Sequence, residues 1–122
     1  MIIAIVQETL SQEMIEEAAE GESVECLCLV EEETLQAALQ EGTPGVIFIE
    51  IGLAALDGPS LVQKLKQNPS TRKIPIVAFG NSLRADLLQD AKELGSDLVL
   101  AKSAFRAQLP GLIRHYSKST GA

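Results

Sequence analysis

Short apolar segments alternate along the chain with segments whose apolar residues recur every three or four positions. The short segments are continuously hydrophobic and rich in Ile, Val and Leu. They span residues 2–6, 24–30, 46–51, 74–79 and 98–101. Continuous apolar character is typical of parallel β-strands that are covered on both faces. Glu25 lies inside the second segment and therefore predicts an edge strand there.

The intervening segments have the periodicity of amphipathic helices. Their predicted buried stripes are Leu10, Met14 and Ala18; Leu35, Ala38 and Leu39; Leu61, Val62 and Leu65; Leu83, Leu87, Ala91 and Leu94; and Phe105, Leu109, Leu112, Ile113 and Tyr116. Thr9 and Gln12 are available as a capping box for the first helix. Gly95 predicts the end of the fourth helix, and Pro110 predicts that the fifth starts late or kinks.

Regular alternation of strands and helices predicts a three-layer α/β sandwich with a five-stranded parallel sheet and helices on both faces. The 122 residues, of which 46% are hydrophobic, fit one such domain. We predict that it spans residues 1–116 and that residues 117–122 form a disordered tail or a linker stub.

Charge is divided unevenly between the two parts of the chain. The net charge is −7, but residues 1–50 carry 12 Glu and no base, whereas residues 51–122 carry 5 acids and all 10 bases. A net-acidic chain argues against non-specific nucleic-acid binding. The apolar runs are too short to span a membrane, and no basic segment precedes the first of them. We therefore expect a cytoplasmic protein that does not bind membranes.

Charged side chains follow three of the predicted strands. Glu8 follows the first strand, Glu50 lies near the end of the third, and Lys102 follows the fifth. Since the carboxyl ends of parallel strands meet at one edge of the sheet, these three groups should converge. They could hold a hard cation or form an ion pair. The first loop has a carboxylate and no glycine, which excludes most phosphate-cradling sites.

Residues 49–58 (Ile-Glu-Ile-Gly-Leu-Ala-Ala-Leu-Asp-Gly), residues 61–66 and residues 69–77 resemble the receiver domain of bacterial response regulators. The resemblance covers essentially the whole chain and includes Asp57-Gly58 at a helix start, Ile74-Pro75 before the fourth strand and Lys102 after the fifth. It implies a flavodoxin-like, doubly wound sheet with strand order 2-1-3-4-5.

The resemblance also implies that the phosphorylation site is degenerate. Glu50 stands where receivers have the phosphorylated aspartate, and Gln7 and Glu8 stand where they have an acidic Mg²⁺-binding pair. Gly80 replaces the hydroxyl residue that contacts the phosphoryl group. Val99 replaces the aromatic switch residue. Lys102 is retained, although Ser103 replaces the proline that usually follows it.

These departures identify the chain as similar to a pseudo-receiver. We expect no enzymatic activity, no cofactor and no metal, with a Mg²⁺ site at Glu8 and Glu50 as the alternative. Glu50 is either a built-in mimic of the phosphorylated state or an acid paired with Lys102, and we favour the pair. The runner-up function is a phosphorylatable receiver with another acceptor, Asp57 being the nearest. A third hypothesis is a small-molecule-binding domain on the same fold.

The division of charge predicts where a partner binds. In a receiver-like arrangement, the fourth helix, fifth strand and fifth helix form the surface through which receivers dimerise or dock. We expect a protein partner or a second copy to bind there, with the bases Arg84, Arg106 and Arg114 on the opposite side from the acidic first half.

Cys26 and Cys28 lie two residues apart on a predicted strand, so their side chains share a face. This spacing is poor for a disulfide, and we expect two buried core thiols. His115 is the only histidine, and we expect it on the surface of the last helix.

Overall fold

The computed structural model describes residues 1–52 and 57–120. The described elements are β1 (Ile2–Ile5), α1 (Thr9–Gly21), β2 (Cys26–Leu29), α2 (Glu32–Glu41), β3 (Ile47–Ile51), α3 (Gly58–Gln67), β4 (Ile76–Gly80), the short 3₁₀ helix η1 (Ser82–Arg84), α4 (Ala85–Glu93), β5 (Leu98–Ala101) and α5 (Lys102–Thr120).

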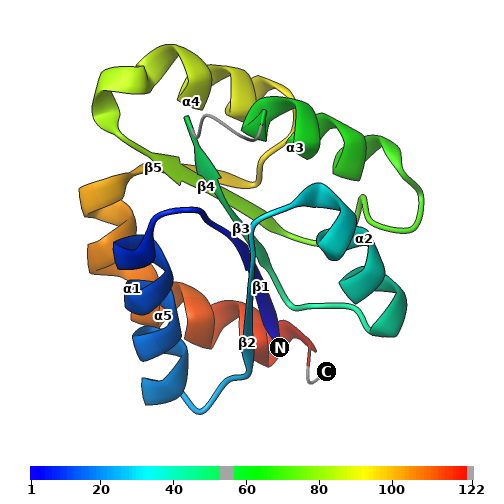
Figure 1. Cartoon of the computed structure of the whole chain (residues 1–122), viewed down its shortest axis with the longest axis vertical. Helices are drawn as coiled ribbons and strands as arrows, with labels where there is room; N and C mark the ends of the chain where they lie inside the picture. Colours follow the sequence, from blue (N-terminus) through cyan, green and yellow to red (C-terminus); the bar gives the residue numbers. More distant parts are fainter. Residues whose placement is uncertain (53–56, 121–122) are drawn as a thin grey trace.

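The strands of the described residues form one parallel sheet in the order β2-β1-β3-β4-β5 (Figure 1). Helices α1 and α5 cover one face, and α2, α3 and α4 cover the other. The predicted three-layer sandwich and strand order are therefore confirmed. So is the edge position of β2.

Alternation along the strands divides the core between the two faces. In β3, Ile47, Ile49 and Ile51 pack towards α2, α3 and α4, whereas Phe48 packs towards α1 and α5. On that second face Phe105 of α5 stacks on Phe79, with ring centroids 3.9 Å apart, and meets Phe48 edge-on at 5.2 Å. These contacts hold α5 against the sheet.

Two predicted helix faces are wrong in part, although Met14 and Ala18 of the first and Leu87, Ala91 and Leu94 of the fourth do pack against the core. In α1 the buried residues are Ser11, Ile15 and Ala19, and Leu10 is 77% exposed. The predicted capping box is absent, because Glu8 is the N-cap and makes no side-chain capping bond. Leu83 was predicted to be buried in the fourth helix, but it lies in η1 and is 86% exposed. The apolar pattern counted both leucines because it could not tell a helix end from a helix interior.

The fifth helix also differs from its prediction. It begins at Lys102, directly after β5, and continues through Pro110 to Thr120. The helix therefore begins earlier than predicted, and it extends four residues beyond the predicted domain boundary at residue 116. Gly95, in contrast, follows Leu94, the C-cap residue of α4, and has a φ of +121°, which confirms the predicted helix end.

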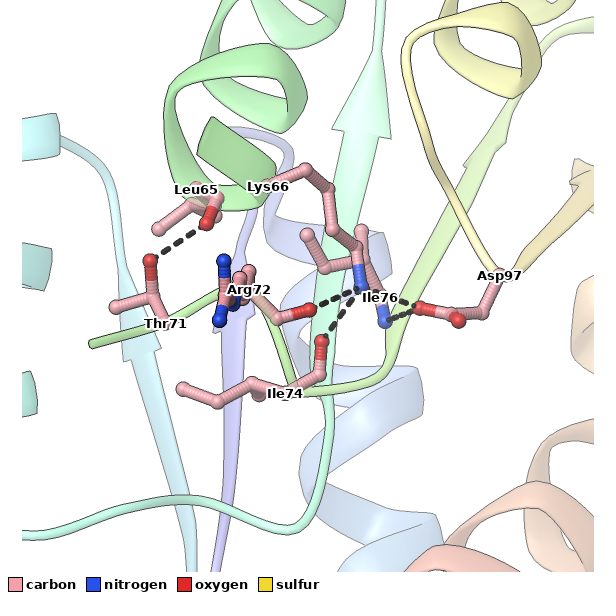
Figure 2. A network of polar contacts seen from close by, with 7 residues as sticks. All are labelled: Leu65, Lys66, Thr71, Arg72, Ile74, Ile76 and Asp97. Carbon is pink, nitrogen blue, oxygen red and sulfur yellow. Dashed lines mark hydrogen bonds and ion pairs between the residues drawn. The ribbon is translucent and has the colours of Figure 1, made fainter. Parts of the chain in front are cut away.

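Lys66 of α3 lies opposite the predicted site, at the end of the sheet where β4 and β5 begin, and forms a network of hydrogen bonds there (Figure 2). Its ammonium donates to the carbonyl oxygens of Arg72 at 3.2 Å and Ile74 at 3.0 Å, and to Asp97 Oδ2 at 2.8 Å. The same Asp97 oxygen accepts from the backbone N–H of Ile76 at 2.8 Å. One side chain thus ties α3, the loop before β4 and the loop before β5 together.

Candidate functional site at the carboxyl edge of the sheet

Glu50 is buried near the carboxyl end of the central strand β3. Its residue exposure is 2%, in a strand whose other members are apolar. Alternation puts its side chain on the same face as Phe48, which is the face that α1 and α5 cover. A carboxylate in this position needs hydrogen-bond donors, because burying an unpaired charge is very costly.

Lys102 is the cationic partner of Glu50. Its ammonium lies 3.2 Å from Glu50 Oε2 and 3.1 Å from Glu8 Oε2. The register of β5 brings it there, because Ala101 pairs with Gly80 of β4 and α5 begins at the next residue. Partial burial lowers the pKa of Lys102, but the hydrogen bonds to Glu8 and Glu50 outweigh it and the net shift is upward. The predicted convergence of Glu8, Glu50 and Lys102 is confirmed.

Ser11 is a site residue that the sequence analysis missed. Its hydroxyl donates to Glu50 Oε2 at 3.0 Å, and the residue is 1% exposed. Ser11 lies in the first turn of α1, where the helix dipole also favours a negative charge. The available signal was its spacing of four from Ile15 and eight from Ala19, which places a serine on the buried face of the helix.

The carboxylates at this edge face an ammonium and a hydroxyl. Glu50 Oε2 is bound by Lys102 and Ser11, and Glu8 Oε2 is bound by the same ammonium. The other oxygen, Glu50 Oε1, is buried and has no hydrogen-bond partner within the described residues. The described part of the chain contains no group of three or more His, Cys, Asp or Glu residues that could hold a metal ion. The arrangement is an ion-pair cluster in which one ammonium holds two carboxylates.

Gly80 ends β4 directly beside Ile51 of β3. A Cβ atom at position 80 would lie 2.9 Å from the Ile51 carbonyl oxygen and 3.4 Å from the Ile51 Cβ. The two strand ends therefore approach too closely to admit a side chain without a backbone shift. A residue with a hydroxyl side chain at position 80 would require the two strand ends to move apart.

The other two sequence-predicted positions, Gln7 and Val99, are not members of these ion pairs. Gln7 is half-buried in the loop between β1 and α1. Val99 is half-buried in β5, where it pairs with Ala78 and packs against the core on the α2, α3 and α4 side.

The three arginines predicted as a partner surface do not lie on one face. Arg114 forms a two-pronged contact with Glu22, at 3.0 Å and 3.1 Å. Arg106 lines a groove of about 750 Å³ between α1 and α5, together with Leu10, Glu13, Glu17 and Lys102. Arg84 lies in η1, 3.8 Å from Asp86.

The predicted separation of charge onto opposite sides is accordingly wrong. Ion pairs join the acidic first half to the basic second half, at Lys64–Glu32, Lys102–Glu8 and Arg114–Glu22. The sequence showed which segments carry each charge but not which helices become neighbours.

The solved structures to which this chain is similar include receiver domains. The chain is similar to a putative response regulator from Chloroflexus aurantiacus, with a TM-score of 0.82, 19% identity and 94% of each chain covered. It is similar to the receiver domain of NtrX from Brucella abortus, with a TM-score of 0.82, 18% identity, 95% of this chain and 97% of that chain covered. A third is the receiver domain of a sensor histidine kinase from Pseudomonas aeruginosa, with a TM-score of 0.78, 21% identity and 94% of each chain covered.

The fold is therefore that of response-regulator receiver domains. Comparison of the sequence with protein-family models and with curated proteins gives no match. Among the described residues, no helix combines the length and apolar character that crossing a membrane requires.

Proposed function

We propose that this chain is a phosphorylation-independent receiver module that acts by binding another protein in two-component-type signalling. The proposal extends to a bacterial, cytoplasmic setting, because the similar structures come from bacterial response regulators and sensor kinases. It includes the absence of enzymatic activity.

The observation that carries this proposal is the double engagement of Glu50 Oε2 by Lys102 and Ser11. In-line phosphoryl transfer depends on positioning and on charge neutralisation by a metal ion. Here the carboxylate at the acceptor position is buried and turned towards α1 and α5. The ammonium that would contact a phosphoryl group is already in contact with two carboxylates. The Pseudomonas receiver, in contrast, has a magnesium ion coordinated in its active-site cleft.

The alternative acceptor, Asp57, is already used by the fold. Its carboxylate accepts a hydrogen bond from the Ser60 backbone N–H at 3.1 Å and so caps α3. A capping carboxylate stabilises its helix by about 1 kcal/mol, and phosphorylation would end that contact. This observation disfavours a phosphorylatable receiver with Asp57 as the acceptor.

The test is incubation of the full chain with acetyl phosphate and Mg²⁺, followed by intact-mass measurement. A receiver that accepts phosphate is the positive control under the same conditions. We expect the mass of this chain to stay unchanged. A stable phosphoryl adduct, on Glu50 or on Asp57, would overturn the proposal and identify the acceptor by peptide mapping.

The partner surface that we propose is the face formed by α4, β5 and α5. Leu83 and Arg84 lie in η1, which leads directly into α4. Leu83 is 86% exposed, and Arg84 Nε lies 3.8 Å from Asp86 Oδ1. A photo-crosslinking residue at position 83, introduced into the chain in its native cells, should give a discrete protein adduct. The matched control is position 10, a leucine on α1 that is 77% exposed. Adducts from position 10 alone would contradict this choice of surface.

A further inference from the structure

Cys26 and Cys28 form a pair of thiols on one face of the edge strand β2. Both are free and half-buried, and their sulfur atoms lie 3.8 Å apart. They pack beside the α1 and α5 side of the core and remain partly open because β2 has a neighbouring strand on only one side. Nothing in the proposed signalling function uses them.

The distance between the sulfur atoms distinguishes a disulfide from a metal-binding site. A disulfide requires an S–S bond of about 2.05 Å, and residues two apart on a strand have Cα atoms near the upper limit of about 6.8 Å for such a bond. A tetrahedral metal ion with M–S bonds of about 2.3 Å holds two thiolates about 3.8 Å apart. The observed separation of 3.8 Å therefore matches metal chelation without movement of the strand.

One negative charge beside the thiols favours a cation. The hydrogen bond between the thiols is the largest influence on both: it raises the pKa of Cys26 and lowers the pKa of Cys28. Burial and the negative charge of Glu16 of α1 act to raise the pKa of each thiol, without reversing the net lowering at Cys28, and the same negative charge attracts a metal ion. A thiolate is the form that binds metal.

We propose that Cys26 and Cys28 are a bidentate site for a thiophilic divalent metal ion of the Zn²⁺ and Cd²⁺ class. Binding forms two metal–sulfur bonds and releases two thiol protons to solvent, so charge and atoms balance. The described residues provide no third ligand of the His, Cys, Asp or Glu type within a common cluster. Solvent or small external ligands complete the coordination, as in other sites with open positions.

The probe is Cd²⁺, titrated into the reduced full chain while the thiolate-to-cadmium charge-transfer absorbance is followed. We expect a saturable band at one ion per chain. Cys26→Ser and Cys28→Ser should each weaken binding by more than about tenfold and diminish the band, because one thiolate remains. Glu16→Gln should weaken Cd²⁺ binding slightly. Glu25→Gln is the matched control, because Glu25 is exposed and adjacent in sequence but on the other face of the strand, and it should bind as the wild type does.

Circular dichroism of each variant establishes that it is folded before its affinity is compared. The absence of a charge-transfer band in the wild type would overturn the proposal, as would an unchanged band in Cys26→Ser. A ratio of one ion per two chains would also overturn it, because the site would then be a four-thiolate centre shared between two copies.

Discussion

The carboxylate of Glu50 and the ammonium of Lys102 lie 3.2 Å apart, with Glu50 3% exposed and Lys102 38% exposed at the side chain. The acid is thus inside the protein and its counter-charge is at the surface. Burial of a charge costs more than a single ion pair returns, but removal of the partner leaves the full cost behind. Lys102 is therefore more important for stability than its exposure suggests.

Replacement of Lys102 by Met should destabilise the fold by about 1–2 kcal/mol, a value below the usual range for buried pairs because Lys102 is partly solvated. Urea denaturation measures the free energy of unfolding. The control is the same substitution in a Glu50→Gln background, where no buried charge remains and the cost should fall to about 0.5 kcal/mol or less. An equal cost in both backgrounds would mean that the pair does not contribute.

The contribution of Lys102 should disappear at high pH. Its pKa in the folded protein lies above the ordinary value of 10.5, since the bonds to Glu8 and Glu50 outweigh the lowering by partial burial. A base with a raised pKa stabilises fully below its unfolded pKa, and this stabilisation is lost as the pH rises through the folded pKa. The difference in unfolding free energy between wild type and Lys102→Met should hold steady from about pH 7 to 9 and shrink above 10.5. A difference that grows with pH would contradict the assignment.

The Glu50–Lys102 contact was predictable because both residues lie at the carboxyl ends of strands, and parallel strands bring these ends together. The strands themselves were predictable because their apolar runs are continuous: β5 has the predicted bounds, Leu98–Ala101. Ser11 was not predicted, because the apolar pattern counts only hydrophobic residues, although its spacing from Ile15 and Ala19 places it on the buried face of α1. Leu10 was consequently assigned to the core in its place.

Contacts between segments that are distant in the sequence are the second feature that the sequence could not predict. Lys66 and Asp97 are 31 positions apart, and both look like ordinary surface charges in the sequence. Arg114 and Glu22 are 92 apart. Only the packing of α3 beside the β5 entry loop, and of α5 beside α1, makes these residues neighbours. The predicted charge separation failed for this reason.

Lys66→Met should destabilise the fold by about 2–3 kcal/mol, because it leaves the Arg72 and Ile74 carbonyls and the Asp97 carboxylate without their shared donor. The side chain of Lys66 is only 17% exposed. Lys64→Met, two positions earlier on the same helix, is the matched control: its side chain is 61% exposed and pairs with Glu32 alone. It should cost less than about 1 kcal/mol. Chemical denaturation of both variants measures the difference, and similar costs would refute the role of the network.

Two glycines should respond in opposite directions to alanine. Gly80→Ala should destabilise the fold by about 1–3 kcal/mol, because the new methyl group would lie 2.9 Å from the Ile51 carbonyl oxygen. Gly111→Ala is the control inside α5, where a Cβ meets nothing within 4 Å. It should stabilise by up to about 1 kcal/mol through helix propensity. Thermal unfolding of the two variants checks this, and a neutral Gly80→Ala would show that the β3 and β4 ends separate easily.

Restoration of the acids should restore cation binding before it restores phosphorylation. Glu50→Asp shortens the side chain by one methylene, which weakens its contacts with Lys102 and Ser11, and Gln7→Asp replaces a neutral amide with a second carboxylate beside Glu8. The double variant should gain about 1.4 kcal/mol of unfolding free energy at a Mg²⁺ concentration ten times its Kd, whereas the wild type should not respond.

Acetyl phosphate should still leave the mass of the double variant unchanged, because Gly80 provides no hydroxyl and the carbonyl of Ile51 occupies the space for one. Gln7→Asp alone is the control, since Lys102 still holds Glu50 in that variant. A Mg²⁺ response in the wild type equal to that of the double variant would mean that the Lys102 ion pairs do not block the site.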